Sequence, residues 1–133
     1  MDFLGKRPKP AQSTTARGQQ AEDAALAHLQ TRGLKLVERN YRTPGRGGGE
    51  IDLILRDRDG SLVFVEVRSR NTERFGGAGG SIGRLKQQRI VLAARHYLMR
   101  LAAAPPCRFD VVLVDSAGNQ MRLEWLQAAF EAL

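Results

Sequence analysis

Three carboxylate side chains occupy positions where the surrounding pattern calls for apolar residues. Glu22 shares a predicted helical face with Ala25 and Leu29, at three- and seven-residue spacing. Asp52 and Glu66 each lie inside a short run that is otherwise rich in branched apolar residues. Carboxylate oxygens are the preferred ligands of hard divalent cations, so acids that converge in one place are typical of a metal site.

The spacing of the last two acids predicts that they face each other. The strand candidates 50–55 and 62–68 flank a turn-rich stretch, and a three-residue loop ending at Gly60 would form a hairpin between them. This register places Asp52 opposite Glu66, with their Cβ atoms about 5 Å apart. Like charges so close repel unless a cation lies between them, which predicts Mg²⁺ or Mn²⁺ bound there. The alternative is that Arg side chains or backbone N–H groups hold these carboxylates with no catalytic role.

Two basic side chains are expected beside the acids. Arg68 follows Glu66 by two residues and therefore points to the same face of the strand. Lys86 precedes Ile90 and Ala93 on the packing side of a helix, so it leans toward the sheet. The predicted catalytic set consists of two acidic and two basic residues, namely Asp52, Glu66, Arg68 and Lys86. In this set, the two cations would orient water or a phosphate. A snorkelling lysine at a helix end is the alternative for Lys86.

Positive charge is concentrated directly after the acids. The chain carries a net charge of +7, and residues 68–108 hold nine basic residues and one acidic residue. Such a segment favours a polyanionic partner, and its basic side chains suit contacts with the phosphates of a nucleic acid. A solvated helix face, or a surface that binds an acidic protein, would give the same pattern. The residues predicted to contact nucleic acid are Arg70, Arg74, Arg84, Lys86, Gln87 and Arg89.

The elements that must position these residues follow an α/β pattern. Helices are predicted at 15–32, 81–103 and 125–133, and strands or extended segments at 34–41, 50–55, 62–68, 109–114 and 120–124. The order α-β-β-(β)-α-β-(β)-α predicts a mixed sheet flanked by helices. Residues 1–17 are basic and poor in apolar side chains, which predicts a disordered arm before a single domain at 18–133.

Composition excludes several classes of protein. The chain has 133 residues and one cysteine, Cys107, so an internal disulfide framework is excluded. Its longest apolar run has five residues, far short of the roughly 20 that a membrane-spanning helix needs. The beginning of the chain lacks the apolar core of a signal peptide. We therefore expect a cytoplasmic protein with no membrane association.

Six segments together resemble the YraN-like family of small bacterial proteins. They are residues 18–24, 38–42, 49–54, 63–68, 86–89 and 108–112. That family is similar to the PD-(D/E)XK nucleases, so the resemblance implies a restriction-endonuclease-like fold and a metal-dependent endonuclease, with branched or processed DNA among the expected substrates. It makes Asp52 and Glu66 the two motif acids, and Glu22 the helical acid that often completes the metal site. Related nucleases often pair, so it also implies a homodimer as one assembly to test.

The sequence departs from the family motif at Arg68, where a lysine is usual. Arginine stays protonated and cannot take a proton from water, although it can hold a phosphate oxygen. Lys86 and Gln87 match the polar pair that often begins the following helix. Either hydrolysis needs no lysine at the motif position, or Lys86 takes that role, or activity is reduced or lost. The last case would leave a nucleic-acid-binding protein of nuclease ancestry that does not cut.

Overall fold

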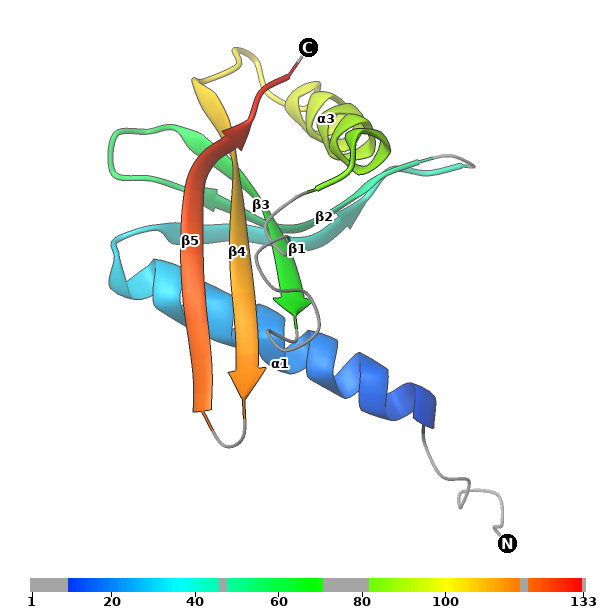
Figure 1. Cartoon of the computed structure of the whole chain (residues 1–133). Helices are drawn as coiled ribbons and strands as arrows, with labels where there is room; N and C mark the ends of the chain where they lie inside the picture. The colour runs from blue at the N-terminus through cyan, green and yellow to red at the C-terminus, as the bar shows by residue number, and fades with distance from the viewer. Residues whose placement is uncertain (1–9, 46–47, 71–81, 118–119, 133) are drawn as a thin grey trace, which may run out of the picture.

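The described residues form one five-stranded sheet and two helices (Figure 1). The computed structural model describes residues 10–45, 48–70, 82–117 and 120–132. The elements, in chain order, are α1 (Pro10–Thr31), β1 (Lys35–Arg42), β2 (Glu50–Arg56), β3 (Leu62–Arg70), α3 (Arg84–Leu98), β4 (Cys107–Ala117) and β5 (Gln120–Phe130). Neighbouring strands pair in chain order, all antiparallel except β3 with β4, which are parallel. The predicted α/β class and mixed sheet are confirmed.

The two helices cover opposite faces of the sheet (Figure 1). On one face, Ile54 and Phe64 pack against Ile90 of α3. On the other, Leu53 and Val65 pack against α1. Because successive side chains of a strand alternate between the faces, β2 and β3 must be apolar on both sides, as interior strands are.

The register predicted for the β2–β3 hairpin is confirmed. Leu53 pairs with Val65 and Ile54 with Phe64. Gly60 has a φ of 92°, a left-handed conformation that glycine adopts at little cost. Because side chains alternate along a strand, this register directs Asp52 and the acid on β3 to the same face of the sheet.

The helix α3 lies close to the beginning of β2. A Cβ atom added at Gly49 would lie 2.0 Å from the backbone carbonyl oxygen of Arg89, so only glycine allows this approach. Gly49 therefore sets the distance between α3 and the sheet.

The helix predicted at 125–133 is wrong, because β5 continues to Phe130. Trp125 pairs with Val112 of β4, and its Nε1–H donates to the carboxylate of Asp110 at 2.9 Å. The N–H of Ala128, a residue with a φ of 50°, donates to the same carboxylate at 2.9 Å. These contacts with β4 outweigh the local amphipathic pattern.

The predicted ends of the other two helices also differ from those observed. The helix predicted at 15–32 begins at Pro10 and ends at Thr31, so residues 10–17 of the predicted arm are helical. The remainder of the arm, residues 1–9, lies outside the described residues. The helix predicted at 81–103 spans only Arg84–Leu98. Within the described part of the chain, no helix is long and apolar enough to cross a membrane.

Asp110 should be a major determinant of stability. Its fully buried carboxylate accepts hydrogen bonds from Arg108, Trp125 and Ala128. The substitution Asp110→Ala leaves these donors without their acceptor, which should lower the free energy of unfolding by about 3 kcal/mol or more. Urea unfolding measures this change. A much smaller loss is expected for Asp59→Ala at the exposed hairpin loop, and equal losses for the two variants would contradict this role.

Candidate functional site

Asp52 and Glu66 lie side by side where β2 and β3 cease to pair. The last pair of the hairpin ladder is Leu53 with Val65. Beyond it, the N–H of Val67 donates to Oδ2 of Asp52 at 2.8 Å, so a carboxylate replaces a backbone acceptor. The side chain of Glu66 is only 8% exposed. The structure thus brings the two predicted motif acids together, as the register required.

Burial makes this pair hard to ionise fully. Burial first, and then the negative charge of Glu66, raise the pKa of Asp52 to about 7, against the partial compensation of the Val67 N–H. The pKa of Glu66 is also raised by burial, although Lys86, a hydrogen bond with Asp52 and the charge of Arg68 oppose the rise. The two groups titrate as a unit, so the pair retains a proton up to near-neutral pH.

The two predicted cations lie beside this pair. Nζ of Lys86, in the first turn of α3, is 3.5 Å from Oε2 of Glu66, and the lysine side chain is 46% exposed. Lys86 therefore leans toward the sheet while its ammonium group still reaches solvent. The charge of Arg68 acts on Glu66 from the same strand. The two cations offset part of the negative charge of Glu66.

Glu22 is held elsewhere by partners that sequence reasoning missed. Its Oε1 accepts hydrogen bonds from Nη2 of Arg39 at 3.1 Å and from Nδ2 of Asn40 at 3.3 Å. Its charge still reaches the site, because it contributes to the raised pKa of Asp52. Among the described residues, no three His, Cys, Asp or Glu side chains gather closely enough to hold a metal ion. The metal-binding role of Glu22 stays a prediction.

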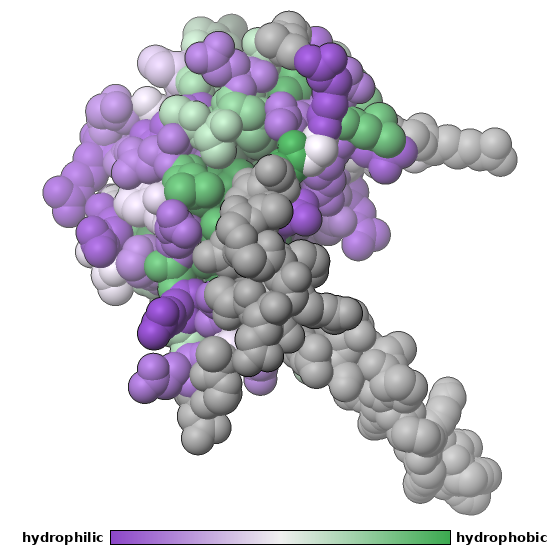
Figure 2. All heavy atoms as spheres, viewed as in Figure 1, coloured by the Kyte–Doolittle hydropathy of each residue, from purple (hydrophilic) through white to green (hydrophobic). Residues whose placement is uncertain are grey.

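Most of the residues predicted to contact nucleic acid belong to α3. Arg84, Lys86 and Arg89 are exposed there. The side-chain amide of Gln87 donates to the carbonyl oxygen of Ile82 at 2.8 Å, just before the helix. Arg70 is the last residue of β3, and Arg74 lies outside the described residues. In the view of Figure 2, hydrophilic side chains cover much of the described surface, and apolar side chains form smaller areas between them.

Sequence reasoning also missed Gly49, the residue that allows α3 to approach β2. It is the last residue of a glycine-rich run that precedes β2. The signal that could have found it is its position directly before β2, because a close approach of two backbones is one of the standard uses of glycine in or beside a strand. Arg39 and Asn40 offered no comparable signal, since their partner lies on a distant helix.

The donor set of the acidic pair suits a hard divalent cation. Two carboxylates lie next to each other, and their mutual repulsion contributes to the raised pKa of Asp52. Such ions take oxygen ligands and keep several waters, so two carboxylates are enough protein ligands for Mg²⁺. Asp52 and Glu66 are the residues that would hold it.

A mixed sheet with one helix on each face and an acidic pair on two adjacent strands defines an α/β protein of the restriction-endonuclease-like class. Residues 21–114 match the model of "Uncharacterised protein family UPF0102". The chain is 65% identical to a UPF0102 protein of Acidovorax sp. (strain JS42), over 99% of both chains. It is 68% identical to one of Paracidovorax citrulli (strain AAC00-1), over 90% of this chain and 86% of that protein. The chain belongs to the UPF0102 family, which is the YraN-like family that its motifs resemble.

The raised pKa of Asp52 predicts a pH-dependent stability. The carboxyl binds its proton more tightly in the folded state, with a pKa of about 7, than at the ordinary value of 3.8. The resulting stabilisation is complete below 3.8 and is lost as the pH rises through about 7. The substitution Asp52→Asn keeps an acceptor for the Val67 N–H but removes the charge. The free energy of unfolding of the variant should therefore exceed that of the wild type by about 2 kcal/mol near pH 8. The difference should shrink toward about pH 5.

Urea unfolding across this pH range, without divalent cations, measures the effect. Glu38→Gln serves as the control, because Glu38 is a more exposed carboxylate that pairs with Arg100 at 3.2 Å. The difference in free energy of unfolding between Asp52→Asn and the wild type should change with pH much more than the difference between Glu38→Gln and the wild type. A constant gap for Asp52→Asn would contradict the shifted titration.

Proposed function

We propose that this protein is a metal-dependent endonuclease that hydrolyses phosphodiester bonds of DNA, with branched or processed DNA as expected substrates. The observation that carries the proposal is the buried pair of Asp52 and Glu66 beside Lys86. Burying two acids side by side raises their pKa values and lowers the stability of the fold near neutral pH. A purely structural role does not explain this arrangement. A site that must bind a cation gives a physical reason for that cost.

Asp52 and Glu66 would hold Mg²⁺ or Mn²⁺. When bound there, such a metal supplies activation of water and neutralises charge that develops on a phosphoryl group. The carboxylates must first release their shared proton, so metal affinity should rise with pH through the pKa of about 7 of Asp52. Glu22 would join the site only after it leaves Arg39 and Asn40.

The cations of the chain would act on the phosphate. Lys86 reaches solvent and lies 3.5 Å from Glu66, so its ammonium group can hold a phosphate oxygen while the acids face the metal. Arg68 would stabilise negative charge on the transferring group without exchanging a proton. The exposed basic side chains of α3 would bind the DNA backbone on either side of the cleaved phosphate, which gives affinity without sequence recognition.

We propose the bacterial cytoplasm as the place of action and a homodimer as an assembly to test.

A second candidate function is nucleic-acid binding without cleavage. Arg68 stands where the resembling nucleases usually carry a lysine, and it cannot act as a base. Glu22 is engaged by two side chains of β1, so two acids rather than three are available to a cation. Both observations favour a protein that keeps the fold and the basic surface but has lost the chemistry.

A cleavage panel tests the proposed function. Duplex, single-stranded, flap and four-way DNA are incubated with the wild type in Mg²⁺, in Mn²⁺ and in EDTA. We expect metal-dependent products from at least one substrate, and a loss of activity of about two orders of magnitude or more in Asp52→Asn and in Glu66→Gln. Glu38→Gln, an acid outside the site, should retain wild-type activity.

The panel separates the two functions. Binding without cleavage by the wild type would refute the enzyme and support the second candidate. Activity gained in Arg68→Lys would then show that this position is the cause. Cleavage that persists in both acid variants would mean that the chemistry lies elsewhere. Calorimetry of Mn²⁺ against the wild type and Asp52→Asn tests the metal site without any substrate.

A further inference from the structure

The strand β5 forms one edge of the sheet. It is the last strand in the order β1-β2-β3-β4-β5, and among the described elements it pairs only with β4 (Figure 1). Its pairing with β4 is regular from Gln120 to Leu126, and the side chains along this stretch are exposed or half-buried. The backbone N–H and C=O groups on the outer side of such a strand are a template for pairing with another strand.

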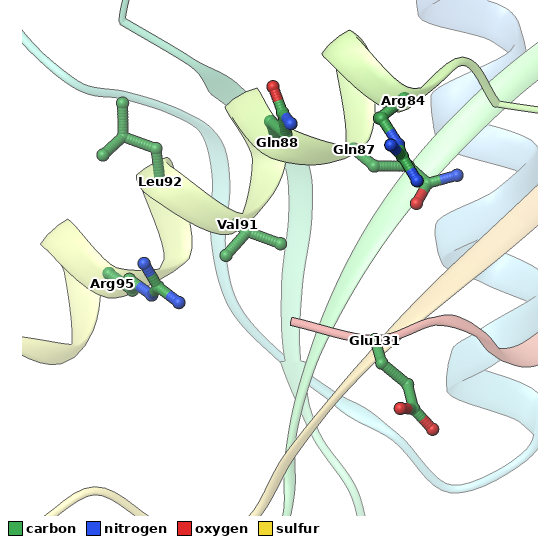
Figure 3. A pocket seen from close by; sticks show the side chains of 7 residues that line it. All are labelled: Arg84, Gln87, Gln88, Val91, Leu92, Arg95 and Glu131. Atoms are coloured by element: carbon green, nitrogen blue, oxygen red, sulfur yellow. The ribbon is translucent and has the colours of Figure 1, made fainter. Parts of the chain in front are cut away.

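Irregular backbone restricts pairing elsewhere along the two edges. On the opposite edge, the register of β1 shifts between Leu36 and Glu38, and such a bulge blunts an edge. In β5 the register shifts only after Leu126, near Ala128 with its φ of 50°. Beyond β5 the chain lies across from α3, where Glu131 lines a pocket together with residues of that helix (Figure 3). The regular part of the β5 edge is therefore residues 120–126.

The charges along this edge are self-complementary. If two copies of β5 pair antiparallel around a two-fold axis at Leu123, Arg122 of each copy lies opposite Glu124 of the other. Opposite charges on directly opposed residues stabilise a strand pair, and like charges destabilise it. The symmetry produces this ion pair twice, so the charges of the edge favour a second copy of the same chain.

The apolar residues of the same stretch fit the same register. Met121, Leu123 and Trp125 alternate onto the face that α1 covers, where Leu123 and Trp125 pack partly against the core and Met121 is 40% exposed. The two-fold axis sets Met121 opposite Trp125 of the second copy, a favourable contact of sulfur with an aromatic ring. It also brings the two Leu123 side chains together, so pairing covers the apolar surface that the edge exposes.

We propose that two copies of this chain associate through β5 and join their sheets into one. The two-fold axis is perpendicular to the sheet, so both α3 helices lie on the same side of it. Asp52 and Glu66 of each copy also lie on that side, which would present two acidic sites to one DNA molecule. The inference gives the homodimer proposed above a definite surface, and it does not depend on nuclease activity.

Sedimentation velocity over a range of protein concentrations, without DNA or divalent cations, tests the interface. We expect a reversible dimer whose dissociation constant rises about tenfold in Arg122→Glu, because two ion pairs become two like-charge contacts. Adding Glu124→Arg to that variant restores opposite charges and should return the constant to within about threefold of the wild type. Lys35→Glu, the same charge reversal on the exposed side of β1, is the matched control.

A cross-linking experiment tests the register independently of charge. Arg122 also lies opposite Asp115 of β4, and Glu124 has a contact within its own chain, so urea unfolding checks the fold of the charge variants. Cysteine is then introduced at Leu123 in a Cys107→Ser background, because only a two-fold axis at that residue sets it opposite itself. A short bismaleimide should cross-link Leu123→Cys into dimers. Leu36→Cys, an exposed position on the opposite edge strand, should remain monomeric on a denaturing gel.

Each outcome supports or overturns the inference. A dimer weakened by Arg122→Glu, restored by the double variant and cross-linked at position 123 supports it. A wild type that stays monomeric at high micromolar concentration would overturn it and leave the edge to a strand of another protein. Equal effects of Arg122→Glu and Lys35→Glu, or cross-linking of Leu36→Cys alone, would assign the dimer to another surface. Because neither experiment contains DNA or metal, these results are independent of the cleavage panel.

Discussion

The juxtaposition of Asp52 and Glu66 inside the sheet is the constraint on which the rest of the site depends. The hairpin turn at Gly60 fixes the register of β2 and β3, and that register puts both acids on one face. Their burial raises the pKa of each, and the charge of Glu66 raises that of Asp52 further. The cost of this arrangement is reduced by a retained proton, by Lys86 or by a bound cation. A site that depends on pH and metal would change between a protonated state and a metal-bound state.

The surrounding elements determine which of these compensations is within reach. The helix α3 begins beside the acids because Gly49 allows its backbone to pack closely on the start of β2, and this brings Lys86 to 3.5 Å from Glu66. The opposite face is filled by α1, whose Glu22 is turned toward β1 by Arg39. The site is thus formed by the sheet and α3, and α1 influences it through charge. The helix α3 supplies the lysine of the site from its first turn.

Local rules predicted the parts of this site that depend on local structure. The register of β2 and β3 followed from strand alternation and a glycine turn, and it is confirmed. It places the two acids together, while their catalytic and metal-binding roles stay predictions. The partners of Glu22 could not be predicted, because they come from β1 after an irregularity in its pairing between Leu36 and Glu38. The predicted C-terminal helix was wrong for a similar reason. Its apolar spacing fitted a helix, but a hydrogen bond from Trp125 to a buried carboxylate of β4 and pairing along that strand hold it extended.

The most direct test of this account is a carbon-13 NMR titration of the side-chain carboxyl groups of Asp52 and Glu66, with and without Mg²⁺. Without metal, the account predicts that the pair titrates in two steps, one of them near the pKa of about 7 of Asp52. Saturating Mg²⁺ should move that step to lower pH, because the cation and the proton compete for the same oxygens. Titration of both carboxyls near their ordinary values, with no response to Mg²⁺, would contradict the central claim.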